Sequence, residues 1–268
     1  MALDRHILLA PHFPALRADT LRRTESRVQD ALRTCGKTWH EAGVEVLVTM
    51  SAAWAPEGPF QIDNGARHKT LVDFAGIETD LRETSDGWPD LANALHANGI
   101  DNGLPVETVH RGMDHGTAVP LSYLCPDLSC RVVMLSASQR RAEDLALWGE
   151  VVRRTCEGAG ARIAIFVGGS LSYNIEAFAE GKDHAEGREL DRMILGRLEA
   201  GDWDGLARTD PAELAAGVAQ EDLRHLWFLG GVLGSPEPGR VLAYHRHPSV
   251  GSAVVSFDLN DDQPAGSR

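Results

Sequence analysis

Short apolar runs of strand length alternate along the chain with longer amphipathic stretches of helix length, which is typical of α/β proteins. One run, Cys130–Ala137, is apolar at successive positions and therefore predicts a central strand that is buried on both faces. The run Arg162–Val167 is similar, and two glycines and a polar turn follow it. The runs that we expect to form strands are His6–Ala10, Val44–Met50, a short one near Val106, Cys130–Ala137, Arg162–Val167, Gly239–His245 and Ser252–Leu259.

Between these runs, apolar residues recur at helical spacing. The segment after Cys130–Ala137 places Leu145, Trp148, Val151, Val152 and Cys156 on one helix face. Three further stretches predict helices: a long polar one over Thr20–Ala42, one over Trp88–Gly99 that Gly99 ends, and a helical region over Asp183–Gly234.

No internal repeat and no long linker divides the chain, so one α/β domain over residues 1–259 is the simplest organisation. We expect residues 260–268 to form a disordered tail, because this segment is short, polar and terminal.

Composition narrows the class of partner. The 268 residues are 43% hydrophobic and 24% charged, as in an ordinary globular protein, but the formal net charge is −13. An acidic surface does not attract nucleic acid or an anionic membrane, so we expect neither as a partner. No apolar run reaches the roughly 18 residues that span a bilayer, and the first residues lack the order of a signal peptide. We therefore expect a cytoplasmic protein.

Several polar or reactive residues follow directly after predicted strands, where open α/β sheets build their sites. Taken singly, each has an ordinary explanation. A lone histidine is usually a surface residue, and acidic residues at the start of a helix are stabilised by the helix dipole. The sequence contains no P-loop, G-x-S-x-G or H-E-x-x-H motif. The candidates are His12, the position of Ala53, His115, the group Ser170, Ser172 and Tyr173, and the pair Glu221 and Asp222.

Five short motifs occur in order along the chain, and their order and spacing resemble the class III extradiol ring-cleavage dioxygenases. They are LLAPHFPAL (8–16), VTMSAAW (48–54), GMDHGTAVPL (112–121), VGGSLSYN (167–174) and EDLRHLWFLGGVL (221–233). The resemblance implies a single LigB-like domain with a central mixed β-sheet and helices on both faces. It also implies a family chemistry, the Fe(II)-dependent cleavage of catechols or aminophenols.

In that family, two histidines and one glutamate hold the iron and leave positions open for O₂ and substrate. The resemblance places the first histidine on His12 and the glutamate on Glu221, or on Asp222 with a shift of one residue. The second histidine falls on Ala53, which has no ligand atom. We therefore expect Fe(II) to be absent or weakly bound in this chain.

The resemblance also assigns residues to substrate and proton transfer. His115, in the D-H-G-T motif, corresponds to an acid–base histidine, and Tyr173 replaces a second one. Since a phenol has a pKa of about 10, Tyr173 is not a base at neutral pH. The residues implied to be catalytic are His115 and Tyr173, and those implied to bind substrate are His12, Trp54, His115, Ser172 and Tyr173.

Three hypotheses follow. The chain is most similar in pattern to the non-catalytic subunit of two-component aminophenol dioxygenases, which predicts association with a homologous catalytic chain or with copies of itself. It could instead be a divergent enzyme acting on an aromatic substrate through His12, His115 and Glu221, with His110, His245 or His247 rebuilding the metal site. The third hypothesis is a protein that binds a small aromatic compound without turnover.

Overall fold

The apolar runs form the strands of one eight-stranded mixed sheet in the computed structural model, which describes residues 6–71, 73–74, 76–77 and 79–257. The order across the sheet is β6-β3-β7-β2-β8-β1-β10-β9, and β4 pairs with β5 separately. The strands are β1 (His6–Ala10), β2 (Val46–Ser51), β3 (Phe60–Asp63), β4 (Arg67–Lys69), β5 (Thr84–Asp86), β6 (Val106–Val109), β7 (Arg131–Ser136), β8 (Ile163–Gly168), β9 (Arg240–His247) and β10 (Val250–Ser256).

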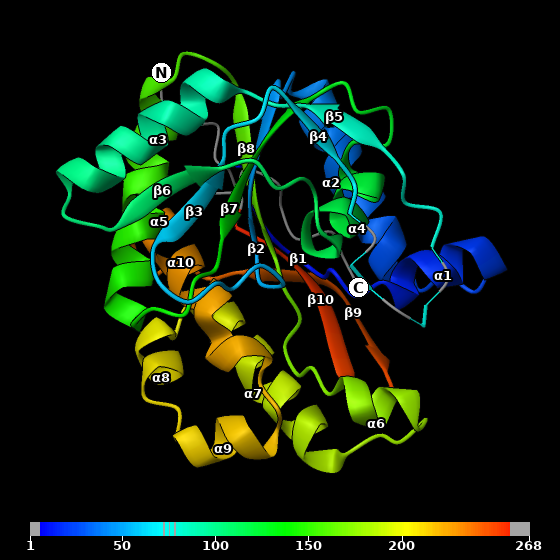
Figure 1. The fold of residues 1–268 in the computed structure, drawn as a ribbon. Coiled ribbons are helices and arrows are strands. Elements are labelled where there is room, and N and C mark those ends of the chain that lie inside the picture. Colours follow the sequence, from blue (N-terminus) through cyan, green and yellow to red (C-terminus); the bar gives the residue numbers. More distant parts are fainter. Residues whose placement is uncertain (1–5, 72, 75, 78, 258–268) are drawn as a thin grey trace.

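Helices cover both faces of this sheet, as the predicted fold class requires (Figure 1). α3, α5 and α10 lie on one face, and α2 and α4 lie on the other. The helices are α1 (Ala15–Arg22), α2 (Arg27–Glu41), α3 (Pro89–Asp101), α4 (His115–Leu124), α5 (Ala142–Gly158), α6 (Ile175–Ala179), α7 (Ala185–Ala200), α8 (Trp203–Ala207), α9 (Pro211–Ala216) and α10 (Arg224–Leu233), with a 3₁₀ turn η1 (Gln220–Leu223) before α10.

The central strands have no polar face, because successive side chains enter two different cores. Along β2, Val46, Val48 and Met50 pack under α5 and α10, whereas Leu47 packs under α2 and α4. Strands β1, β2, β7 and β8 are mutually parallel. Beyond β1 the sheet continues with β10, which is antiparallel to β1, and then with β9, which is antiparallel to β10. This arrangement confirms the prediction of a mixed sheet flanked by helices on both faces.

The helix predicted over Thr20–Ala42 was wrong in its first part. The chain forms two helices there, because Arg23 adopts a left-handed conformation (φ 59°) that ends α1. α2 then begins afresh at a capping box made by Ser26 and Gln29. The sequence prediction missed α1 because its polar residues continue the pattern of the next helix.

Other element boundaries also differ from expectation. Gly99 does not end the helix that was predicted over Trp88–Gly99. It lies inside α3, where Val106 and Trp148 pack against its backbone. The region Asp183–Gly234 is helical, as predicted, and it divides into α7, α8, α9, η1 and α10. The predicted disordered tail, residues 260–268, lies outside the described residues.

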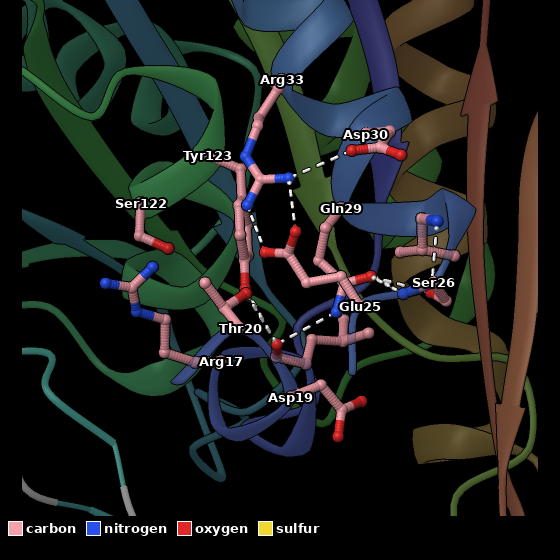
Figure 2. A network of polar contacts seen from close by, with 12 residues as sticks. Arg17, Asp19, Thr20, Glu25, Ser26, Gln29, Asp30, Arg33, Ser122 and Tyr123 are labelled. Carbon is pink, nitrogen blue, oxygen red and sulfur yellow. Dashed lines mark hydrogen bonds and ion pairs between the residues drawn. The ribbon is translucent and has the colours of Figure 1, made fainter. Parts of the chain in front are cut away.

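A polar network fixes α1 against α2 and α4 (Figure 2). The Tyr123 hydroxyl on α4 donates to the Leu16 carbonyl at 2.9 Å and lies 2.8 Å from Thr20 Oγ1. Gln29 on α2 donates to the same carbonyl at 3.1 Å. Because these contacts are partly or fully buried, α1 has a defined position relative to the sheet.

In the part of the chain that the structure describes, no helix has both the length and the apolar character that a membrane span requires.

The closest helix contact predicts an effect on stability. A Cβ on Gly231 of α10 would lie 1.9 Å from the Ala146 carbonyl oxygen of α5. Gly231→Ala should therefore destabilise the protein by about 1–3 kcal/mol through overpacking. The control Gly196→Ala lies in an exposed helix position with nothing within 4 Å, and it should stabilise by about 0.5–1 kcal/mol. Urea unfolding followed by circular dichroism measures both; equal effects would contradict the packing argument.

Candidate functional site

The candidate residues gather where three parallel strands end. β1, β8 and β2 are neighbours in the sheet, and their last residues are in register, with Ala10 and Ser51 both opposite Gly168. His12 follows β1 and Ala53 follows β2. This confirms that the strand ends converge at one rim of the sheet.

Two motif glycines let α4 begin directly above these strand ends. A Cβ on Gly168 would lie 2.2 Å from the Gly116 carbonyl oxygen, and a Cβ on Gly116 would lie 1.9 Å from Ser51 Oγ and 3.3 Å from the methyl group of Ala53. Side chains at these two glycines would separate α4 from β2 and β8. The contact also places Ala53 beside the start of α4.

His115 is the first residue of α4. The preceding Asp114 is 1% exposed and caps the helix by accepting the Thr117 N–H at 3.0 Å. It also accepts hydrogen bonds from Ser51 Oγ at 2.9 Å and from Arg111 at 3.1 Å. These bonds fix the helix start and therefore the direction of the His115 side chain.

The His115 ring stacks on His12 and forms a pair with Asp73. The His115 and His12 ring centroids are 5.2 Å apart with an interplanar angle of 16°. His115 Nδ1 lies 3.0 Å from Asp73 Oδ2, and Nε2 is buried with no hydrogen-bond partner among the described residues. In a neutral ring, Asp73 holds the proton on Nδ1, which leaves Nε2 as a base.

Asp73 is suited to this orienting role. Burial alone would raise the pKa of its carboxyl group, but the hydrogen bond and charge of His115 outweigh burial and hold that pKa below its usual value. Asp73 is therefore ionised at neutral pH. Its carboxylate also accepts the backbone N–H of His115 at 3.2 Å.

Aromatic rings form the next layer. Tyr173 stacks on His12 with centroids 5.6 Å apart, and Phe13 contacts Tyr173 edge-on at 5.9 Å. Phe74 lies edge-on to His115 at 5.0 Å. Burial raises the pKa of the Tyr173 phenol, and the nearby charge of Asp73 raises it further, so Tyr173 stays protonated. Such surroundings favour a flat, apolar ligand with a polar edge.

The cavity beside His115 has a volume of about 60 Å³ and is lined in part by Asp73, Phe74 and Leu81. A cavity of about 150 Å³ holds a benzene molecule, so this one admits only a few waters. An aromatic ligand at this cavity requires movement of a lining side chain.

Gln220 contacts His12, although sequence reasoning did not single it out. Its carboxamide nitrogen lies 2.8 Å and its oxygen 3.0 Å from His12 Nε2. The oxygen also accepts the Ser170 backbone N–H. Because a carboxamide can both donate and accept, Gln220 engages Nε2 of His12 in either tautomer of the ring.

Glu221 and Asp222 have their side chains elsewhere. Glu221, 39% exposed, pairs with Arg224 at 2.9 Å, and Asp222, 75% exposed, lies 3.4 Å from the same guanidinium. Both have left-handed backbone conformations, with φ of 47° and 51°. This turn buries Gln220 at 5% exposure and directs the two acids to solvent. The structure therefore does not bring Glu221 or Asp222 to His12.

Burial lowers the pKa of two histidines in this region, His12 and His225. Burial, helped by the potential of His115 and His225 and opposed by the Gln220 hydrogen bond, holds the pKa of His12 well below its usual range. Burial also lowers the pKa of His225 on α10 to about 4. Neither nitrogen of His225 has a hydrogen-bond partner within the described ranges.

Two other predicted residues have different partners. Trp54 is 5% exposed; it donates from Nε1 to Gln61 at 3.0 Å, and Arg111 lies over its ring at 4.9 Å. Ser172 is also buried and accepts from Arg246 at 2.7 Å. These contacts support the walls of the site rather than a surface open to a ligand.

Asp73, Gln220 and His225 carried little sequence signal. Asp73 lies in the irregular segment between Gly58 and Glu107, far along the chain from His115. Gln220 directly precedes the acids to which the glutamate position was assigned, so a shift of one residue would have found it. His225 looks like an ordinary core position on an apolar helix.

Comparison with known proteins identifies the family. The family model described as the catalytic LigB subunit of aromatic ring-opening dioxygenase matches residues 6–256, and the chain belongs to this family. Among 18 matching chains of solved structures is the crystal structure of an uncharacterized protein from Escherichia coli. It is 16% identical, covers 94% of this chain and 98% of its own, and has a TM-score of 0.69. No curated protein matches the sequence.

The family in general depends on Fe(II), so the donors around His12 are informative. The Nε2 atom of His12 faces a neutral amide, and Ala53 offers no donor atom. Among the described residues, His12 belongs to no group of three His, Cys, Asp or Glu ligand atoms within 4.8 Å of one another, and neither does His110. The arrangement at His12 does not fit two histidines and one carboxylate.

The neutral, buried His225 predicts a pH dependence of stability. Its pKa is about 4 in the folded protein and 6.5 for an unperturbed histidine, so the unfolded chain takes up the proton first as pH falls. Stability contributed by neutral His225 is present above pH 6.5 and falls by about 3 kcal/mol between pH 6.5 and 4. His225→Phe should remove this part of the decrease in the free energy of unfolding between pH 6.5 and 4.

Urea unfolding of both proteins at several pH values between 8 and 4.5 measures this difference. At pH 8 neither state is protonated at residue 225, so any difference there reports packing alone. Parallel stability curves for the two proteins would rule out the assignment to His225.

Proposed function

We propose that this chain is a member of the aromatic ring-opening dioxygenase family that holds no catalytic iron at His12 and serves as a non-catalytic subunit. The observation that carries the proposal is the hydrogen bond between Gln220 and His12 Nε2. It occupies the nitrogen that a metal would need and puts a neutral amide where a carboxylate ligand would lie.

The ligand balance supports this proposal. An Fe(II) ion at His12 would displace the Gln220 amide and would gain neither an anionic oxygen nor a second imidazole from Ala53. Loss of residues that merely orient ligands weakens metal binding about 10- to 100-fold, and loss of direct ligands weakens it more. Iron at cellular concentrations would then leave this position.

The remaining groups favour binding of a small phenolic or catechol-like compound. His12, Tyr173, Phe13 and Phe74 offer ring faces and edges in one cluster. The Nε2 atom of His115, oriented by Asp73, would accept the proton of a phenolic hydroxyl. The compound would enter when a ring such as Phe74 moves.

The partner in this proposal is a homologous chain that carries the complete iron site, or a second copy of this chain. The resemblance to the non-catalytic subunits of two-component aminophenol dioxygenases supports it. In such a complex, this chain would stabilise its partner or retain aromatic substrate nearby.

The His115–Asp73 pair favours a second candidate function, a metal-free enzyme acting on an aromatic substrate. A histidine with Nδ1 oriented by a carboxylate and a buried, unpaired Nε2 is a competent general base. Glu221, assigned to this function from the sequence, faces Arg224 instead, so the function would depend on His115, Asp73 and His12.

Rebuilding the ligand set tests the proposed loss of iron. Ala53→His together with Gln220→Glu should raise Fe(II) affinity at least 100-fold, because it restores an imidazole and a carboxylate beside His12. The measurement is anaerobic Fe(II) titration in a His245→Ala background, which removes a separate group of possible ligands. The control Ala55→His with Gln139→Glu adds the same residue types elsewhere. Tight, stoichiometric Fe(II) in the His245→Ala protein without the rebuilt ligands would refute the proposal.

Turnover by the chain alone separates the two functions. With Fe(II) and O₂ supplied, the non-catalytic function predicts no opening of catechol or 2-aminophenol rings above background, followed by absorbance and mass spectrometry. The second function predicts conversion of an aromatic substrate that falls by at least 100-fold in His115→Ala and Asp73→Asn. Conversion unaffected by both variants would exclude His115 as the base.

A further inference from the structure

A second group of possible metal ligands lies outside the His12 site. One ligand atom each from Asp19, His245 and His247 lie within 4.8 Å of one another. Asp19 comes from α1, and the histidines come from β9. Among the described residues, this is the one group of three or more His, Cys, Asp and Glu that meets this distance.

The fold holds the two histidines side by side. Residues 245 and 247 are two apart on a strand, so their side chains leave the same face of the sheet. β10 pairs with β9 along this segment, with His245 opposite Ser252 and His247 opposite Val250. The two imidazole rings meet edge to face, with centroids 4.7 Å apart and an interplanar angle of 88°.

The polar network around Tyr123 positions the third group (Figure 2). Asp19 directly precedes Thr20, and the Thr20 hydroxyl is hydrogen-bonded to the Tyr123 hydroxyl. The Asp19 carboxylate nevertheless points away from Arg17, which pairs with Asp80 instead. Within the described ranges, the one ion-pair partner of Asp19 is His247, whose Nε2 lies 2.8 Å from Asp19 Oδ2.

The group is partly shielded from water and has unused donor capacity. The Asp19 and His247 side chains are 19% and 10% exposed. His247 Nδ1 is buried and has no hydrogen-bond partner in the part of the chain that the structure describes.

We propose that Asp19, His245 and His247 form a binding site for a divalent transition-metal ion, with Zn(II) as the representative ion. Two imidazoles and one carboxylate suit zinc and iron(II), and three protein ligands leave at least one position open to water or to an anionic ligand. Metal–ligand distances of about 2.0–2.2 Å place neighbouring ligand atoms about 3.3 Å apart. Since the present ligand atoms lie within 4.8 Å of one another, no pair has to close by more than about 1.5 Å, and Asp19 and His247 are already 2.8 Å apart.

The site would differ from the family position in place and effect. Phe13 contacts Tyr173 of the His12 cluster at 5.9 Å and His247 at 5.3 Å, so one ring connects the two groups. An ion here would crosslink α1 to the edge strand β9. Since it binds the folded chain alone, it would raise the unfolding temperature in proportion to the logarithm of its concentration.

Titration of the metal-stripped full chain with Zn(II), followed by calorimetry, tests this inference. We expect one equivalent to bind with a dissociation constant of about 1 μM or below. His245→Ala and His247→Ala should each weaken binding more than 100-fold, because each removes a ligand. Zn(II) should raise the unfolding temperature of the parent protein but not of these variants. Co(II) substitution gives an independent readout through its visible bands.

Two controls locate the ion. His40→Ala removes an exposed histidine of α2 and should leave binding unchanged, as should His12→Ala. His245→Ala truncates a half-buried side chain, and circular dichroism without metal verifies its fold, so a loss of binding there is interpretable. Failure of the parent to bind Zn(II) at 100 μM overturns the inference. Binding that is lost in His12→Ala but kept in His245→Ala overturns it as well, and contradicts the proposed function separately.

Discussion

The hydrogen bond between Gln220 and His12 determines the state of the rest of the site. It ties the turn before α10 to the residue after β1, while the same carboxamide accepts the Ser170 N–H after β8. One side chain therefore joins three segments that are far apart in sequence. This contact fixes the ring face that His12 presents to His115 and Tyr173, while burial lowers the pKa of His12.

An unusual backbone turn makes this bond possible. Val218, Glu221, Asp222 and Leu223 all have left-handed φ values between 47° and 59°. Such conformations cost about 1–2 kcal/mol each for residues with a Cβ, so the surrounding structure must impose them. Their effect is to direct Gln220 inward and the two adjacent acids outward to Arg224. Strain of this kind commonly occurs at functional positions.

The sequence predicted the fold class, and it predicted that His12, Ala53, His115 and Tyr173 would converge, because apolar periodicity and strand ends are local properties. It could not predict which residue beside α10 would face His12. That choice depends on three consecutive left-handed residues, for which no pattern of side chains is diagnostic. Asp73 was missed for a related reason, because its pairing with His115 joins residues that are 42 positions apart in the sequence. The predicted helix boundaries were wrong where polar residues continued from one helix into the next, as at Arg23.

In the proposed metal-free state, neutral residues beside His12 avoid a buried charge that has no counter-charge. A carboxylate buried against a neutral imidazole, with no cation beside it, would carry a large desolvation penalty. Glutamine has nearly the same shape and satisfies both His12 and the Ser170 N–H without a charge. A histidine at position 53 would place another imidazole beside the start of α4, where His115 already pairs with Asp73, whereas a methyl group needs no partner. In the proposed metal-free state, the neutral side chains at 53 and 220 need no cation, and His12 serves as a fixed ring among aromatic neighbours.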